Sequence, residues 1–175
     1  MQTSRSSLYF LLVALIAGFI LSLVFYAFEQ KPEDIAASIK IVDFQSKWIP
    51  STPPLKSMVK PWEVFIAPTI SFRVKNVGKK PINFIAFNAV FLRKRSEMKL
   101  GTSYKIAIRK PLKPGGVSEV ITMTSDGGYA GSSIKALMDN PFWEPVICRL
   151  YFAKSEKYIL LGTFDIEDRI ETGSN

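Results

Sequence analysis

The sequence predicts a mainly β protein, in which an N-terminal transmembrane helix precedes an antiparallel β-sandwich with one short inserted helix. Three observations support this fold class. Residues 8–28 form a run of 21 residues without a charge. Beyond it, short apolar segments alternate with turns rich in proline, glycine and lysine. Only one of these later segments has helical spacing, and many short strands separated by turns are typical of two packed antiparallel sheets.

The uncharged run is long enough to cross a membrane. At a rise of about 1.5 Å per residue, its helix spans roughly 30 Å, the thickness of the hydrocarbon layer. The run is longer than the apolar region of a cleaved signal peptide, and the bulky Phe25 near its end is atypical of a cleavage site. Arg5 lies in the seven-residue N-terminal tail, which favours a signal anchor. We therefore expect a single-pass membrane protein with an extracytoplasmic C-terminal domain, most simply a periplasmic domain on a bacterial inner membrane.

Small residues recur along one stripe of this predicted helix. Ala14, Gly18 and Ser22 are spaced four apart, so they lie on one face. Small side chains let the backbone of a second membrane helix approach closely. The stripe therefore predicts packing against another integral membrane subunit, although such residues are also ordinary in membrane helices.

The remaining 147 residues amount to one domain, with enough chain to bury a core. Residues 29–37 are expected to be a linker or a short helical extension, residues 38–167 the sandwich, and residues 168–175 a polar tail. A first strand at 38–49 is followed by a proline-rich loop. Further strands, about seven in all, are expected at 62–76, 82–95, 103–109, 117–124, 142–153 and 158–166.

Two segments depart from simple strand alternation. The segment 128–140 predicts the inserted helix, because Ile134, Leu137 and Met138 share one face. The strand 82–95 is apolar on both faces, whereas a sandwich buries one face of each strand. Something must cover its second face, and the candidates are the inserted helix or a partner subunit. The residues of that partner-covered face are Ile85, Phe87 and Phe91.

The chain lacks the residue types and motifs that are common in catalytic sites. It contains no histidine, which removes the commonest general base and the commonest neutral metal ligand. Its single cysteine, Cys148, alternates with apolar neighbours and is expected to lie inert in the core. No glycine-rich phosphate loop is present. We therefore expect no catalytic, cofactor-binding or metal-binding residue and no cofactor.

One segment carries nearly all of the formal net charge of +8. Its 21 residues hold eight basic side chains opposed by one acid, Glu97. Such a patch attracts anionic lipid or an acidic protein surface, although it could also be a solvated rim that prevents edge pairing. Nucleic acid is disfavoured, because Tyr104 is the segment's only aromatic residue. The basic residues are Arg93, Lys94, Arg95, Lys99, Lys105, Arg109, Lys110 and Lys113.

Residues 62–123 carry a family resemblance. A strand ends in RVKNVGKKPI (73–82), an apolar strand follows, and a Pro-Gly-Gly turn opens VSEVITM (117–123). This pattern resembles the late-embryogenesis-abundant-type and FxLYD-like immunoglobulin-type domains. The resemblance implies an immunoglobulin-like sandwich with a binding or scaffolding role and no catalytic residues. The inserted helix at 134–138 departs from the simplest version of that fold.

These observations predict a non-catalytic, membrane-anchored accessory subunit of a multi-protein membrane complex, whose sandwich makes extracytoplasmic protein contacts. The alternative is an independent lipid- or envelope-polymer-binding module that uses the basic segment 93–113. An enzyme acting through carboxylates is a third hypothesis, and it would need two acids in one cleft.

Overall fold

The computed structural model describes residues 9, 13–18, 30–52, 64–108, 110–141, 143–154 and 156–170. The chain divides into two compact units, Met1–Lys31 and Pro32–Asn175. The second unit contains, in order, α2 (Pro32–Ala37), β1 (Ile39–Pro50), β2 (Val64–Asn76), β3 (Ile85–Arg93), β4 (Lys99–Ile108), β5 (Ile121–Thr124), β6 (Tyr129–Gly131), α3 (Ile134–Met138), β7 (Val146–Lys154) and β8 (Lys157–Asp165).

The structure contradicts the predicted transmembrane helix. Within the first unit, the described residues 9 and 13–18 are helical. No helix in the described part of the chain is both long enough and apolar enough to span a membrane. Apart from Tyr9, the rest of the predicted span lies outside the described residues. The fold class is corrected to mainly β, and the prediction of a single-pass protein with an extracytoplasmic domain is corrected with it.

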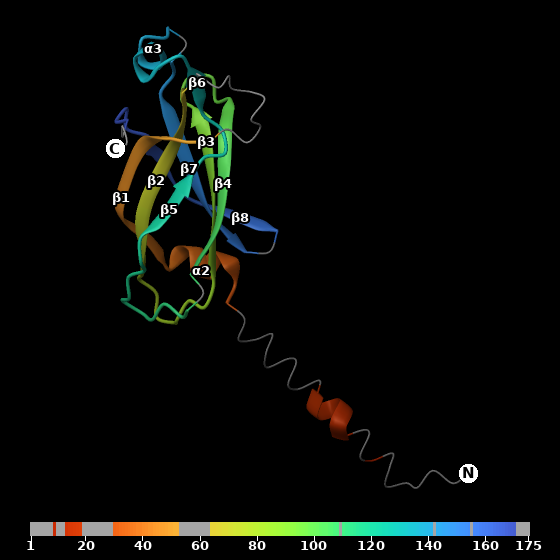
Figure 1. Ribbon diagram of the computed structural model, residues 1–175. Helices are drawn as coiled ribbons and strands as arrows, with labels where there is room; N and C mark the ends of the chain where they lie inside the picture. The colour runs from red at the N-terminus through yellow and green to blue at the C-terminus, as the bar shows by residue number, and fades with distance from the viewer. Residues whose placement is uncertain are drawn as a thin grey trace, which may run out of the picture. The chain divides into compact units, whose positions relative to one another are not determined.

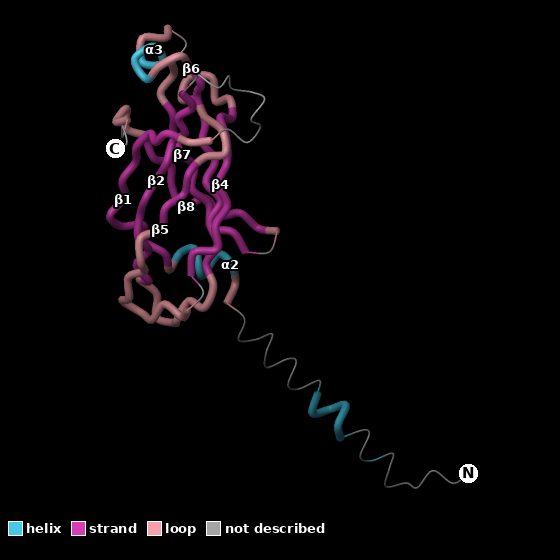
Figure 2. Tube along the Cα trace, in the orientation of Figure 1, coloured by secondary structure: helices cyan, strands magenta, loops and turns pink. Residues whose placement is uncertain are grey.

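The second unit is a sandwich of two antiparallel sheets, as predicted (Figures 1 and 2). One sheet has the order β1-β2-β5, with β6 also paired to β2. The other has the order β4-β3-β7-β8. The described residues thus form eight strands rather than about seven. The additional strand is β6, whose three residues are too few to show a period of two.

The core lies between the two sheets. The predicted alternation along β2 is confirmed, because Ile70, Phe72 and Val74 are fully buried while Arg73 is partly exposed. Phe72 meets Phe87 of the facing sheet edge to face, with ring centroids 5.2 Å apart. Burying rings of this size is the main source of stability in a sandwich.

The two short helices lie at different places on the sandwich. In α2, Ile35 and Ala36 are buried with the core, so this segment belongs to the sandwich unit. The predicted inserted helix is confirmed as α3, where the Ser133 hydroxyl accepts a hydrogen bond from the Ala136 amide and caps the helix. Leu137 of α3 is buried, and α3 contacts β6.

Candidate functional site

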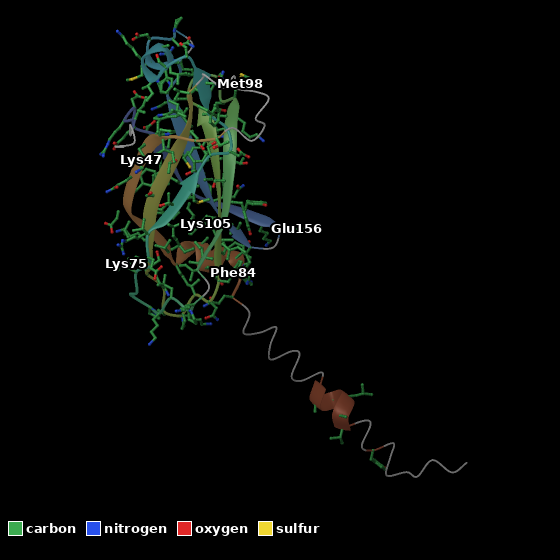
Figure 3. All side chains as sticks on the ribbon, in the orientation of Figure 1. Lys47, Lys75, Phe84, Met98, Lys105 and Glu156 are labelled. Atoms are coloured by element: carbon green, nitrogen blue, oxygen red, sulfur yellow. The ribbon has the colours of Figure 1, made fainter. Side chains whose placement is uncertain are left out.

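Five exposed lysines gather at one end of the sandwich, which we call the lysine-rich end. Lys75 is the penultimate residue of β2. Two further pairs of lysines come from the connection between β2 and β3 and from the connection between β4 and β5. These connections lie at the same end as α2, where Figure 3 labels Lys75 and Phe84. The two connections are bridged by Ile82 pairing with Leu112. The lysines are Lys75, Lys79, Lys80, Lys110 and Lys113.

Asn76 holds these two connections together. Its side chain is fully buried, and its amide nitrogen donates to the carbonyl oxygens of Lys80 (2.9 Å) and Leu112 (2.8 Å). Its amide oxygen accepts from the Gly78 nitrogen at 2.9 Å. Because both donors and the acceptor are used, the buried amide is well satisfied. Asn76 therefore fixes two lysine-bearing turns against each other.

The backbone of Asn76 completes the junction. Its nitrogen donates to the Gly116 carbonyl (2.9 Å), and its carbonyl accepts from the Gly115 nitrogen (2.8 Å). Gly115 has φ +75°, a left-handed conformation that glycine adopts at little cost. The Pro-Gly-Gly turn identified from the sequence is thus a fixed part of the lysine-rich end.

An open cleft lies beside this end, between the edges of β4 and β5. It has a volume of about 510 Å³, within the range of ligand-binding clefts. Its most buried lining residues are Ile108 and Ile121, at 6% and 3% exposure. We call it the edge cleft, and it is lined by Lys105, Ile106, Ala107, Ile108, Lys110, Pro111, Leu112, Ser118, Glu119, Val120 and Ile121.

The part of β4 nearest to Thr102 is closed by polar contacts. The Thr102 nitrogen donates to the Asp126 carboxylate (2.6 Å), and the Thr102 carbonyl accepts from the Asp126 nitrogen (2.9 Å). Farther along, the Lys105 ammonium donates to the Thr122 carbonyl on β5 at 3.0 Å. Figure 3 labels Lys105 on this side of the sandwich. Beyond Lys105, the side of the sandwich opens into the edge cleft.

The predicted basic segment is not one surface. Its first four residues lie at the turn from β3 into β4, at the other end of a ten-residue strand from Lys110 and Lys113. At about 3.4 Å per residue, that separation is roughly 30 Å. Lys105 lies between the two ends, and the side chain of Arg109 lies outside the described residues.

The residues around the β3–β4 turn are already engaged with the protein. Arg93 lies over the Tyr129 ring, 5.4 Å from its centroid, and Lys94 pairs with Asp165 at 2.5 Å. The Glu144 carboxylate accepts from the nitrogens of Arg95 (2.6 Å) and Ser96 (2.7 Å). These contacts organise the turn and engage the charged groups of Arg93 and Lys94, whereas Arg95 takes part through its backbone nitrogen.

The contacts of Glu144 lower its pKa below the ordinary value. Partial desolvation acts to raise the pKa, but the backbone hydrogen bonds from Ser96 and Arg95 and the Ser96 hydroxyl favour the charged form. The positive charge of Arg93 acts in the same direction. Glu144 is therefore held as an anion that fixes the turn.

The residues expected under a partner are core residues. Ile85, Phe87 and Phe91 are fully buried and belong to the central hydrophobic cluster. They face the other sheet, so the chain itself covers them, and α3 contacts β6 instead of lying on β3. On the opposite face of β3, Asn88 and Val90 are half-buried, whereas Ala86 and Leu92 are buried.

The small-residue stripe stays untested. Ala14 and Gly18 are exposed in the helical residues 13–18, and Ser22 lies outside the described residues. The stripe was predicted for a membrane-spanning helix, which the structure contradicts.

The described residues contain no group of three or more His, Cys, Asp or Glu side chains placed to hold a metal ion. Cys148 is fully buried, and this desolvation raises the pKa of its thiol to about 12. A thiol in that environment is a poor nucleophile.

Sequence reasoning missed three of the five lysines of the lysine-rich end. The residues missed are Lys75, Lys79 and Lys80, together with Asn76 that positions them. Counting charges along the sequence cannot show that residues 75–80 lie beside residues 110–113 in the fold. The available signal was the Asn-Val-Gly turn followed by two lysines, since asparagine often organises a turn through its side chain.

No protein-family model matches this chain, and no curated protein matches it. Among solved structures, it is similar to a Bordetella pertussis protein described as ApaA, with 14% identity and a TM-score of 0.34 over 77% of this chain and 95% of that one. It is also similar to an uncharacterized β-sandwich protein from Clostridium difficile 630, with 13% identity and a TM-score of 0.30 over 74% and 84% of the two chains. These likenesses test neither the family resemblance stated above nor any function.

Proposed function

We propose that this chain is a non-catalytic binding module that holds an acidic partner protein at its lysine-rich end. One observation carries the proposal. Elsewhere on the sandwich, several cations pair with acids, as Lys94 does with Asp165 and Lys157 with Glu33. In the described part of the chain, none of the five lysines of the lysine-rich end forms an ion pair. Concentrated charge without internal partners attracts an oppositely charged surface and speeds its approach.

A protein partner fits this end better than an anionic lipid. The lysines adjoin the edge cleft, which offers apolar side chains and a strand edge in addition to charge. A lipid headgroup can use the lysine charge but cannot pair with a strand edge. The accessory, partner-binding role expected from the sequence thus becomes our proposal, without the membrane anchor.

The test compares two variants of the full chain with the same change in charge. K79E/K80E reverses two lysines of the lysine-rich end, and K99E/K135E reverses two exposed lysines near the β3–β4 turn and on α3. The probe is a fluorescent glutamate-rich peptide, and its binding is followed by anisotropy. We expect K79E/K80E to weaken binding about tenfold and the control to weaken it no more than about twofold.

Two results would overturn the proposal. Equal losses for the two variants would mean that net charge, rather than the lysine-rich end, attracts the peptide. The second is binding to phosphatidylserine vesicles that depends on Lys79 and Lys80 while the peptide fails to bind, which would assign this end to a lipid surface.

A further inference from the structure

We infer that the acidic partner docks as an extended strand, which adds to the outer edge of β4 at Tyr104–Ile106 and places apolar side chains in the edge cleft. This inference rests on the proposed function, since the lysine-rich end supplies the attraction. The added strand supplies the specificity, because main-chain hydrogen bonds fix its register and alternate side chains fill the cleft.

The direction of the backbone groups follows from Thr102. Its nitrogen and carbonyl both bond Asp126, so both point away from β3. In an antiparallel pair, successive residues alternate between pointing toward and away from the partner strand. The register pairs Val90 with Thr102, Asn88 with Tyr104 and Ala86 with Ile106 without a break. The backbone groups of Tyr104 and Ile106 therefore also point to the outer edge.

These outward groups have no strand beside them. In the described residues, β4 pairs with β3 alone and forms the end of its sheet. Proteins commonly protect such edges with inward-pointing charges, and Lys105 is a residue of that kind. However, its ammonium is bonded to the Thr122 carbonyl, which closes the side of the sandwich only at that point. The edge from Tyr104 to Ile106 continues into the open cleft.

The lining of the edge cleft specifies the chemistry of the added strand. Ile108 and Ile121 are its buried apolar residues, and Val120 lines it while 54% exposed. Apolar side chains on one face of the added strand would cover all three. Lys105 and Lys110 face a single acid of the cleft, Glu119, so the lining carries an excess of positive charge. Because successive side chains of a strand point to opposite faces, the apolar residues of the expected occupant enter the cleft and its acidic residues lie on the other face, where the lysine-rich end supplies the attraction.

The first experiment separates strand addition from simple charge attraction. The probes are a peptide of about nine alternating valine and glutamate residues and an isomer with the same residues in two blocks. We expect the full chain to bind the alternating peptide about tenfold more tightly. Two further peptides carry N-methyl groups on all valines or on all glutamates. Because alternate N–H groups face opposite edges, only one of these two should lose binding, by about tenfold.

The second experiment locates the contact on the protein. Amide hydrogen exchange of the full chain should slow at Tyr104 and Ile106 when the alternating peptide is present. V120E, inside the edge cleft, should weaken binding about tenfold. L160E is the matched control, because Leu160 on β8 is 51% exposed and Val120 is 54% exposed. The control should bind as the unmodified chain does.

The outcomes distinguish the inference from the proposed function. Equal binding of the two isomers, unchanged exchange at Tyr104 and Ile106, or equal effects of V120E and L160E would each overturn strand addition and leave the electrostatic proposal in place. Failure of K79E/K80E to weaken either peptide more than K99E/K135E does would overturn the proposed function itself.

Discussion

At the scale of single residues, Asn76 is the side chain that shapes the candidate site. It is buried at the end of β2, and its three hydrogen bonds join the turn at residues 78–80 to the loop at residues 110–116. The Asn76 side chain matters for stability because the Lys80 carbonyl and the Gly78 nitrogen would otherwise be left without a partner, and the Leu112 carbonyl would keep only the Ile82 nitrogen.

Asn76→Ala should therefore destabilise the protein by about 1–3 kcal/mol, since the Lys80 carbonyl and the Gly78 nitrogen lose their partner, while the Leu112 carbonyl keeps only the Ile82 nitrogen. Urea denaturation of the full chain measures this loss. Asn88→Ala is the control, because the Asn88 side chain is half-buried on the outer face of β3, and the change should cost under about 0.5 kcal/mol. Equal stabilities of the two variants would contradict the role of Asn76.

Cys148 gives a second prediction at this scale. Burial raises the pKa of its thiol to about 12, well above its ordinary value near 9. Above that ordinary value the unfolded chain releases the proton while the folded chain keeps it, so this group lowers stability as the pH rises toward 12. At pH 8, alkylation by iodoacetamide should occur only after unfolding. Rapid alkylation of the native chain would show that the thiol is accessible.

At the scale of elements, the turn from β3 into β4 depends on Glu144. Its carboxylate accepts two backbone hydrogen bonds and one from the Ser96 hydroxyl. Since these bonds lower the folded-state pKa of Glu144, the stabilisation is present above the ordinary value near 4.5 and is lost as the pH falls through the lower, folded-state pKa.

Glu144→Gln should accordingly be less stable than the unmodified chain at pH 7, and the difference should shrink as the pH falls from the ordinary pKa of 4.5 through the lower, folded-state pKa. Thermal unfolding between pH 3 and pH 7 measures both quantities. Glu119→Gln is the control, since Glu119 is exposed and lies in the edge cleft rather than at the turn. A difference between Glu144→Gln and the unmodified chain that is independent of pH would contradict this account.

The individual elements differ in how far the sequence predicts them. The alternation in β2 and the capped helix α3 are local patterns, and both are confirmed. The strand β3 is apolar on both faces in sequence, but local patterns cannot say what covers each face. The structure shows Phe87 against the facing sheet. The strand β6 could not be predicted from the sequence, because it forms through its pairing with β2 and shows no periodicity of its own.

At the scale of the whole molecule, the distribution of charge matters more than its total. Counting charges along the sequence assigned the positive charge to one segment, residues 93–113. In the fold, the two ends of that segment lie at opposite ends of β4. The fold also brings Lys79 and Lys80 beside the loop of Lys110 and Lys113 through the bridge between Ile82 and Leu112. This non-local pairing is the part of the candidate site that the sequence could not provide.

The prediction of a membrane-spanning helix is wrong for a reason unrelated to the distribution of charge. A long apolar run is evidence of the ability to span a membrane, but it does not establish an extended helix. The described residues of the first unit are helical at 9 and 13–18, and no helix in the described part of the chain could span a bilayer. The proposed binding role therefore depends on the sandwich unit alone.

The central claim is that the lysine-rich end binds an acidic partner. The most direct measurement is an NMR titration of the ¹⁵N-labelled full chain with the alternating valine–glutamate peptide. The account predicts saturable shift changes at residues 76–80, 104–108 and 110–118, with none at α3 or β6. Shift changes centred on the β3–β4 turn and α3, or no saturable change anywhere, would contradict it.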